Sequence, residues 1–135
     1  MSEFQKLELE DKPYTEIGGT SKMDDITVKP ADLVLVFGKP IESDGYKVSG
    51  EYIFKHRTGA VLTMYDWKWT TLYDEDNPYT PTEFWALNKE MPFSVGARDL
   101  SYVDDFKDFI HTTIRNMKHT YNEGGIRGQS IEYNG

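Results

Sequence analysis

Apolar and polar residues alternate most regularly in two neighbouring segments, residues 47–56 and 60–69. Both segments are rich in β-branched and aromatic residues, and only a three-residue connection ending at Gly59 separates them. Such a short connection joins antiparallel strands, so the pattern predicts a β-hairpin. Alternate side chains of a strand share a face and lie about 7 Å apart. The second strand would therefore present a row of aromatic residues on one face: Tyr65, Trp67 and Trp69.

Shorter apolar segments surround this hairpin. Residues 32–38 form a run that is typical of either a buried strand or a short buried helical turn. Residues 82–88 predict a fourth strand. Residues 92–97, which begin with Pro92, predict a fifth strand at an edge of the sheet. Before the fourth strand, residues 73–81 form a long acidic turn with two prolines. Asp44 and Gly45 predict a further turn ahead of the hairpin.

The strongest helical pattern lies near the C-terminus, at about residues 102–121. Ser101 followed by Asp104 resembles a capping box at its start, and Gly124 and Gly125 would end it. Apolar residues recur at intervals of three and four, which predicts an amphipathic helix with one buried stripe. The stripe comprises Val103, Phe106, Ile110, Ile114, Met117 and Tyr121.

These elements predict an α+β fold, in which an antiparallel sheet of four to five strands carries one long C-terminal helix packed on one face. Residues 1–31 are polar and interrupted by Gly and Pro, so we expect an extended N-terminal arm in which Ile26 and Val28 add one short strand. Residues 32–123 would form a single domain, and residues 124–135 a C-terminal tail.

Charge and cysteine content restrict the function. The chain has 135 residues, with 23 acidic against 15 basic residues and a net charge of −8. This charge disfavours direct binding to nucleic acid or to anionic membranes and favours a basic protein partner, although acidity that only keeps the protein soluble is an alternative. No cysteine is present, so a thiol nucleophile and Cys-ligated metals are excluded. No signal-like segment or apolar run of about 18 residues occurs, and we expect a cytoplasmic protein.

The residues indicate no catalytic site, cofactor or metal site. The three histidines, at positions 56, 111 and 119, are too dispersed in the sequence to suggest one metal site. The phosphate-binding, nucleotide-binding and hydrolase motifs are missing. Asp74, Glu75 and Asp76 lack the spacing of a calcium-binding loop. A non-enzymatic binding protein is therefore the first hypothesis.

The candidate partner-binding residues combine aromatic rings with neighbouring acids. Tyr and Trp supply contact area at interfaces, and carboxylates orient a basic partner. The set is Trp67, Trp69, Tyr73, Asp74, Glu75 and Asp76. Two alternatives stay open: the rings could belong to the core, and the acids could form a solvated turn. A second hypothesis is a small nucleotide-binding protein or enzyme that uses the basic residues Lys55, His56 and Arg57 with Tyr52 around the hairpin.

The segments FGKP, DGYKVSGEY and TMYDWK, within residues 32–76, resemble small uncharacterised proteins of phages and large DNA viruses. The resemblance implies a viral setting, and hence the host cytoplasm. Small acidic proteins of such viruses often inhibit host or defence enzymes. The resemblance thus implies an inhibitor of a host or defence enzyme. From the net charge of −8 and the acid clusters we expect such an inhibitor to present an acidic, DNA-mimicking surface to the basic groove of a nucleic-acid-binding enzyme.

Overall fold

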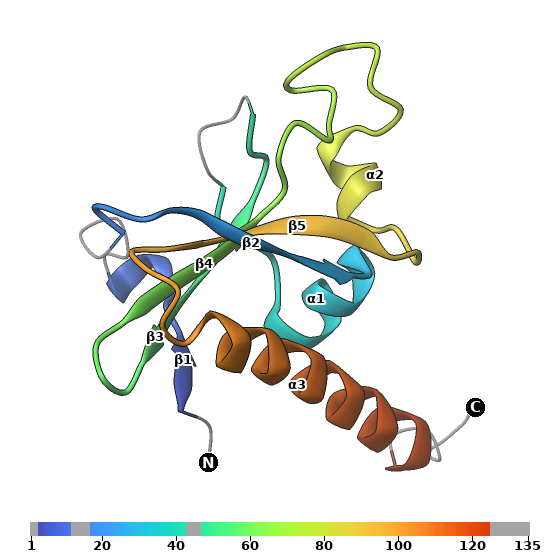
Figure 1. Cartoon of the computed structure of the whole chain (residues 1–135). Helices are drawn as coiled ribbons and strands as arrows, with labels where there is room; N and C mark the ends of the chain where they lie inside the picture. Colours follow the sequence, from blue (N-terminus) through green and yellow to red (C-terminus); the bar gives the residue numbers. More distant parts are fainter. Residues whose placement is uncertain (1–2, 12–16, 43–46, 125–135) are drawn as a thin grey trace.

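In a computed structural model of the chain, residues 3–11, 17–42 and 47–124 are described, and their fold is α+β (Figure 1). Five antiparallel strands form one open sheet in the order β1-β3-β4-β5-β2. The strands are β1 (Phe4–Lys6), β2 (Ser21–Val28), β3 (Glu51–His56), β4 (Val61–Tyr65) and β5 (Met91–Ala97). The helices are α1 (Pro30–Phe37), α2 (Pro81–Trp85) and α3 (Val103–Gly124), with a short 3-10 turn, η1 (Leu9–Asp11).

The predicted hairpin is confirmed as β3 and β4. Tyr52 pairs with Met64, and Phe54 pairs with Leu62. All four side chains belong to the main hydrophobic core, as expected for alternate positions on one face. The connection closes with a hydrogen bond from the His56 amide to the Ala60 carbonyl at 2.7 Å. This hairpin forms the centre of the sheet.

The long C-terminal helix, α3, packs on one face of the sheet beside α1 (Figure 1). Phe106 and Ile110 are completely buried, and Val103 and Ile114 also belong to the core, so the predicted stripe is confirmed over its first three turns. The stripe does not continue to Met117, which is 42% exposed. The helix extends past the edge of the sheet in its C-terminal half (Figure 1). The Tyr121 side chain lies outside the described part.

The prediction of a strand at residues 82–88 is wrong, because this segment contains α2. The Thr80 hydroxyl accepts a hydrogen bond from the Glu83 amide, and the Glu83 carboxylate accepts one from the Thr80 amide. Pro81 occupies the first helical turn, where its missing N–H costs nothing. This capping box, Thr80-Pro81-Thr82-Glu83, is visible in the sequence. Its local hydrogen bonds override the β propensity of Phe84 and Trp85.

The N-terminal segment differs from the predicted arm because it supplies two strands of the sheet. β1 pairs with β3, and β2 pairs with β5 over eight residues rather than forming one short strand around Ile26 and Val28. Phe4, Ile26 and Val28 are buried in the core. β5 therefore lies inside the sheet and not at an edge. Residues 32–38 take the helical alternative, within α1. The predicted turn at 44–45 and the tail after residue 124 lie outside the described residues.

Candidate functional site

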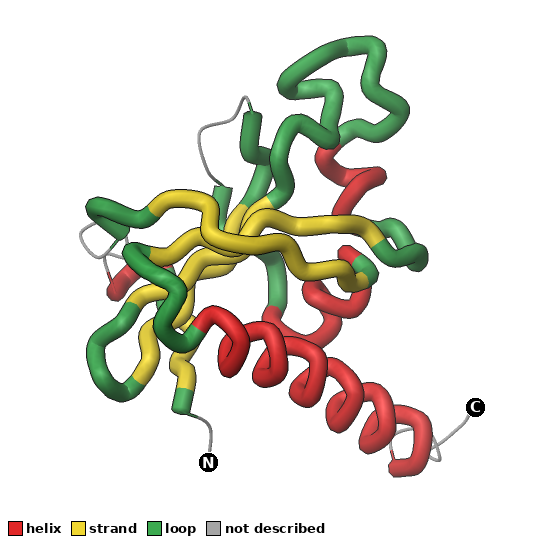
Figure 2. Tube along the Cα trace, in the orientation of Figure 1, coloured by secondary structure: helices red, strands yellow, loops and turns green. Residues whose placement is uncertain are grey.

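A closed loop connects β4 to α2 and stands clear of the sheet at one end of the molecule (Figure 2). Its two ends meet in a bridge between Thr70 and Tyr79, and the Thr71 amide donates a 2.8 Å hydrogen bond to the Tyr79 carbonyl. The Asn77 side-chain amide donates to the carbonyls of Lys68 and Thr70 at 3.0 and 2.9 Å. The loop is therefore held by its own hydrogen bonds and is preformed.

The three acids Asp74, Glu75 and Asp76 lie at the tip of this loop, and all three are exposed. The Asp76 amide donates to Asp74 Oδ1 at 2.9 Å, and the Asn77 amide donates to the Asp74 carbonyl at 2.9 Å. These bonds form a turn that fixes the backbone of the acidic segment. Within the described residues, no Lys or Arg forms a salt bridge with any of the three carboxylates. Their negative charge therefore faces solvent.

Trp67 is the most exposed tryptophan, with 44% of its surface accessible. Its ring packs edge-on against Tyr65, with centroids 6.3 Å apart. The ammonium groups of Lys47 and Lys68 lie 5.7 and 5.4 Å from its centroid, and that of Lys68 also lies 5.0 Å from the centroid of Tyr73. Lys68 thus links Trp67 to Tyr73 and the acidic loop.

Trp69 does not share the face of Trp67, so the predicted aromatic row is wrong. β4 ends at Tyr65, and Lys68 has a φ of 66°, a left-handed conformation that breaks the alternation of side chains. Trp69 therefore turns inward, stacks on Phe84 with centroids 6.4 Å apart, and donates from Nε1 to the Pro92 carbonyl at 3.2 Å. Trp69 therefore packs against the core, which was one of the two alternatives for the aromatic rings, whereas Trp67 is exposed.

Asp66 anchors the chain immediately before Trp67. Its side chain is completely buried. Alternate side chains of a strand share a face, so Asp66 continues the core-facing series of Leu62 and Met64. Its carboxylate accepts hydrogen bonds from the Ser49 amide (2.9 Å), the Ser49 hydroxyl (2.8 Å) and the Gly50 amide (3.0 Å). Burial raises the pKa of Asp66, while these donors act in the opposite direction. Sequence reasoning overlooked this residue, although a carboxylate in a core-facing register is a usable signal.

The basic hairpin residues Lys55, His56 and Arg57 line one pocket of about 430 Å³ together with Glu3, whose carboxylate lies close to both His56 and Arg57. His56 is buried, with Nε2 3.0 Å from a Glu3 carboxylate oxygen and its ring stacked on Tyr102 at 4.1 Å between centroids. The Thr58 amide donates to Nδ1 at 3.2 Å, so Nε2 carries the proton toward Glu3. Arg57 is exposed. These contacts occupy both ring nitrogens of the histidine.

Tyr52, by contrast, does not line this pocket. Its hydroxyl donates a 2.6 Å hydrogen bond to the Gly38 carbonyl, and burial raises its pKa well above the usual value. The Lys55 side chain points to the opposite face of β3 from Tyr52 and Phe54. Tyr52 is therefore a core residue whose hydroxyl is satisfied.

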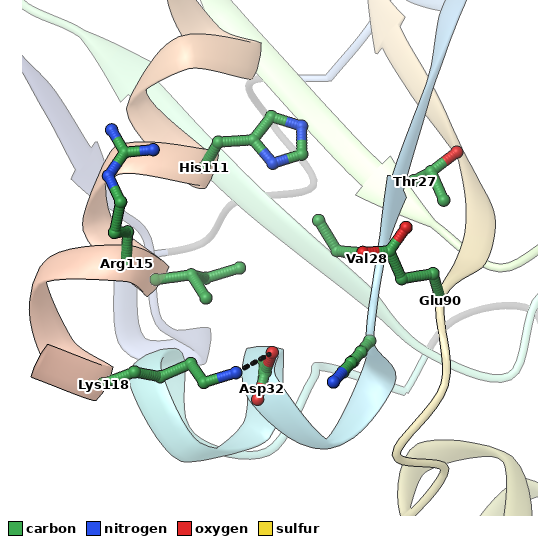
Figure 3. A pocket seen from close by; sticks show the side chains of 9 residues that line it. Thr27, Val28, Asp32, Glu90, His111, Arg115 and Lys118 are labelled. Carbon is green, nitrogen blue, oxygen red and sulfur yellow. Dashed lines mark hydrogen bonds and ion pairs between the residues drawn. The ribbon is translucent and has the colours of Figure 1, made fainter. Parts of the chain in front are cut away.

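Sequence reasoning did not identify a pocket of about 320 Å³ between β2, α1 and α3, which we name the α3 pocket (Figure 3). His111 extends from α3 toward β2, and Lys118 reaches across to Asp32 in the first turn of α1 (Figure 3). Lys118 Nζ lies 3.3 Å from Asp32 Oδ2. The lining residues are Thr27, Val28, Lys29, Asp32, Glu90, His111, Ile114, Arg115 and Lys118. Because they come from three separate stretches of the sequence, residues 27–32, residue 90 and residues 111–118, no local motif could reveal them.

The comparisons with known proteins give no further guide to function. No protein-family model matches the sequence, and a search of curated proteins finds no match. Among the described helices, none combines the length and the apolar character needed to cross a membrane. In the described part of the chain, no group of three or more His, Asp or Glu residues is placed to hold a metal ion. The function is therefore argued from the geometry of the loop.

Proposed function

We propose that this protein is a non-enzymatic binding protein that captures a basic protein partner through one surface, formed by Trp67, Tyr73, Asp74, Glu75 and Asp76 (the loop surface). The observation that carries the proposal is an exposed Trp67 that Lys68 links to Tyr73, the residue directly before three exposed acids in the closed loop. Leu72, 42% exposed, adds apolar area in the same loop. An aromatic anchor beside charges of one sign is typical of protein interfaces.

The two parts of the loop surface would act in different ways. Lys47 and Lys68 lie close to the Trp67 ring, so we expect the ring to contribute buried apolar area and the three acids to receive the partner's cations. Exposed charges mainly raise the association rate, whereas a buried aromatic anchor mainly slows dissociation. The acids and the ring therefore have separable kinetic effects.

A nucleic-acid-binding enzyme is the partner class that this chemistry favours. Its groove is basic because it neutralises phosphates, and a protein of net charge −8 with a preformed acidic loop can compete for such a groove. In this proposal the protein is an inhibitor whose acidic surface takes the place of DNA. The viral setting, with a host or defence enzyme as the target, rests on the sequence resemblance alone.

The test compares two triple variants that remove the same charge at different places. The partner is first captured from host lysate on immobilised protein, identified and purified. The loop variant is Asp74→Asn, Glu75→Gln and Asp76→Asn. The matched control is Asp104→Asn, Asp105→Asn and Asp108→Asn, which removes three exposed acids from α3.

We expect the loop variant to slow association with this partner about tenfold relative to the control variant at low salt. The difference should shrink as salt rises, because the screening length falls from about 10 Å at 0.1 M to about 3 Å at 1 M. Trp67→Ala should instead accelerate dissociation. The loop surface would be refuted if the two triple variants slowed association equally and Trp67→Ala left dissociation unchanged, because net charge alone would then explain binding.

A further inference from the structure

The α3 pocket differs in charge from the rest of the molecule. Three Lys or Arg side chains and two carboxylates line it, so its formal charge is +1 with His111 neutral, whereas the whole chain carries −8. Three of the lining residues, His111, Arg115 and Lys118, follow one another at intervals of four and three on α3. This spacing places them on one face of the helix. The pocket is thus a local concentration of cations in an acidic protein.

The cations of the pocket are not all neutralised by the protein. Lys118 pairs with Asp32, whose side chain is largely buried, and this pair closes one end of the pocket (Figure 3). Lys29 precedes α1, where its carbonyl accepts bonds from the Asp32 and Leu33 amides. Within the described residues, the Lys29 and Arg115 side chains form no salt bridge. The Arg115 guanidinium donates a 3.4 Å hydrogen bond to the Thr112 hydroxyl and points along α3, away from Asp32 and Glu90 (Figure 3). The Lys29 ammonium is therefore the cation of the pocket that remains able to receive an anion there.

The floor of the pocket is apolar. Val28 and Ile114 line it and are 5% and 9% exposed, respectively, so each presents a small hydrophobic area to the cavity. A volume of about 320 Å³ lies at the lower end of the range for small-molecule sites. A ligand with both an anionic group and a small apolar part would match cations at the rim and hydrocarbon at the floor.

We propose that the α3 pocket binds a small organic anion, whose charged group contacts Lys29 and whose apolar part packs on Val28 and Ile114. The pocket shares no residue with the loop surface. Ligand binding here is therefore a property separate from the partner binding proposed above, and either can fail without the other.

Phenyl phosphate is the probe, because it joins a dianion to one apolar ring. It is titrated into the 15N,13C-labelled protein at constant ionic strength, and the Ile114 methyl and His111 ring signals are followed by NMR. We expect saturable shifts of both signals, and weaker binding of inorganic phosphate, which lacks the apolar part. No saturable shift, or equal affinity for the two probes, would overturn the proposal.

Two lysines that flank α1 supply the matched variants. Lys29 lines the pocket, whereas Lys39 follows the other end of the helix and lies outside it. Lys29→Gln should weaken phenyl phosphate binding about fivefold or more, as expected on loss of one charge-assisted hydrogen bond, and Lys39→Gln should change it less than about twofold. Arg115→Gln should weaken binding less than Lys29→Gln, because the Arg115 guanidinium points away from Asp32 and Glu90. Equal weakening by Lys29→Gln and Lys39→Gln would refute the pocket as the binding site.

Discussion

Replacement of Asp66 tests whether its buried carboxylate holds the chain that leads to the loop surface. In Asp66→Ala, three donors lose their acceptor: the Ser49 amide, the Ser49 hydroxyl and the Gly50 amide. A buried donor without a partner costs about 1–3 kcal/mol. The hydroxyl can rotate toward solvent, and removal of a buried charge offsets part of the loss. We therefore expect the free energy of unfolding to fall by about 2–4 kcal/mol.

Asp66→Asn separates the hydrogen bonds from the charge. Its side-chain oxygen can keep both amide bonds now made by Oδ1, to Ser49 and to Gly50, and its amide nitrogen can donate to the Ser49 hydroxyl. We expect a loss of about 1 kcal/mol or less. Asp74→Ala, which removes an exposed carboxylate with one turn bond, should also change stability by less than about 1 kcal/mol.

Urea unfolding followed by far-UV circular dichroism at pH 7 measures all three variants, because this signal does not depend on the tryptophan environments. An Asp66→Ala protein as stable as the Asp66→Asn protein would refute the role of the carboxylate as an acceptor. A large and equal loss in both variants would instead assign the stabilisation to the negative charge.

The same residue predicts a dependence on pH. Burial raises the folded-state pKa of Asp66 above its unfolded value of about 3.9. Between these two values the folded state binds more protons, so stability falls as pH rises through this interval. Asp66→Asn abolishes this titration. The free energy of unfolding of the wild type minus that of Asp66→Asn should therefore decrease as pH rises above about 4, and a constant or increasing difference would contradict the shift.

Two further predictions concern packing. Ile110→Asp places an unpaired charge at a fully buried position and should unfold the domain. Thr112→Asp, on the exposed side of α3, should stay folded, and circular dichroism distinguishes the two variants. A stable Ile110→Asp protein would show that α3 does not belong to the core. Trp69→Ala should lower the free energy of unfolding by about 3 kcal/mol, and Trp67→Ala by less than about 1 kcal/mol. Similar losses in urea unfolding would show that the two rings are equally buried.

The sequence predicts those parts of the fold that depend on local patterns. The β3–β4 hairpin follows from strict alternation and a connection too short for any other pairing. The buried stripe of α3 follows from its three- and four-residue spacing. β1 could not be predicted in the same way, because three residues carry no periodicity. Its strand exists through pairing with β3, more than forty residues away in the chain.

The sequence indicates part of the loop that carries the proposed surface. The acids are visible as a cluster, and the prolines and Asn77 indicate an irregular segment. The separation of Trp67 from Trp69 depends on the positive φ of Lys68, which a non-glycine residue adopts only under tertiary constraint. That constraint includes the 2.6 Å hydrogen bond from the Lys68 amide to the Lys47 carbonyl, a contact between distant residues. Alternation alone therefore gives the wrong face for Trp69.

Among the described residues, hydrogen bonds from both side chains and backbone join the buried anchors to the exposed surface. The Asp66 carboxylate holds the chain directly before Trp67, and the Lys68 amide holds it directly after. The Asn77 side chain closes the loop by donating to the carbonyls of Lys68 and Thr70. A segment held in this way loses little backbone entropy when it binds a partner. Binding to a preformed surface is then limited by encounter and not by folding, which is the regime in which exposed acids have their greatest effect on rate. The rigidity that Asp66 provides is therefore what would let three solvent-exposed charges control association.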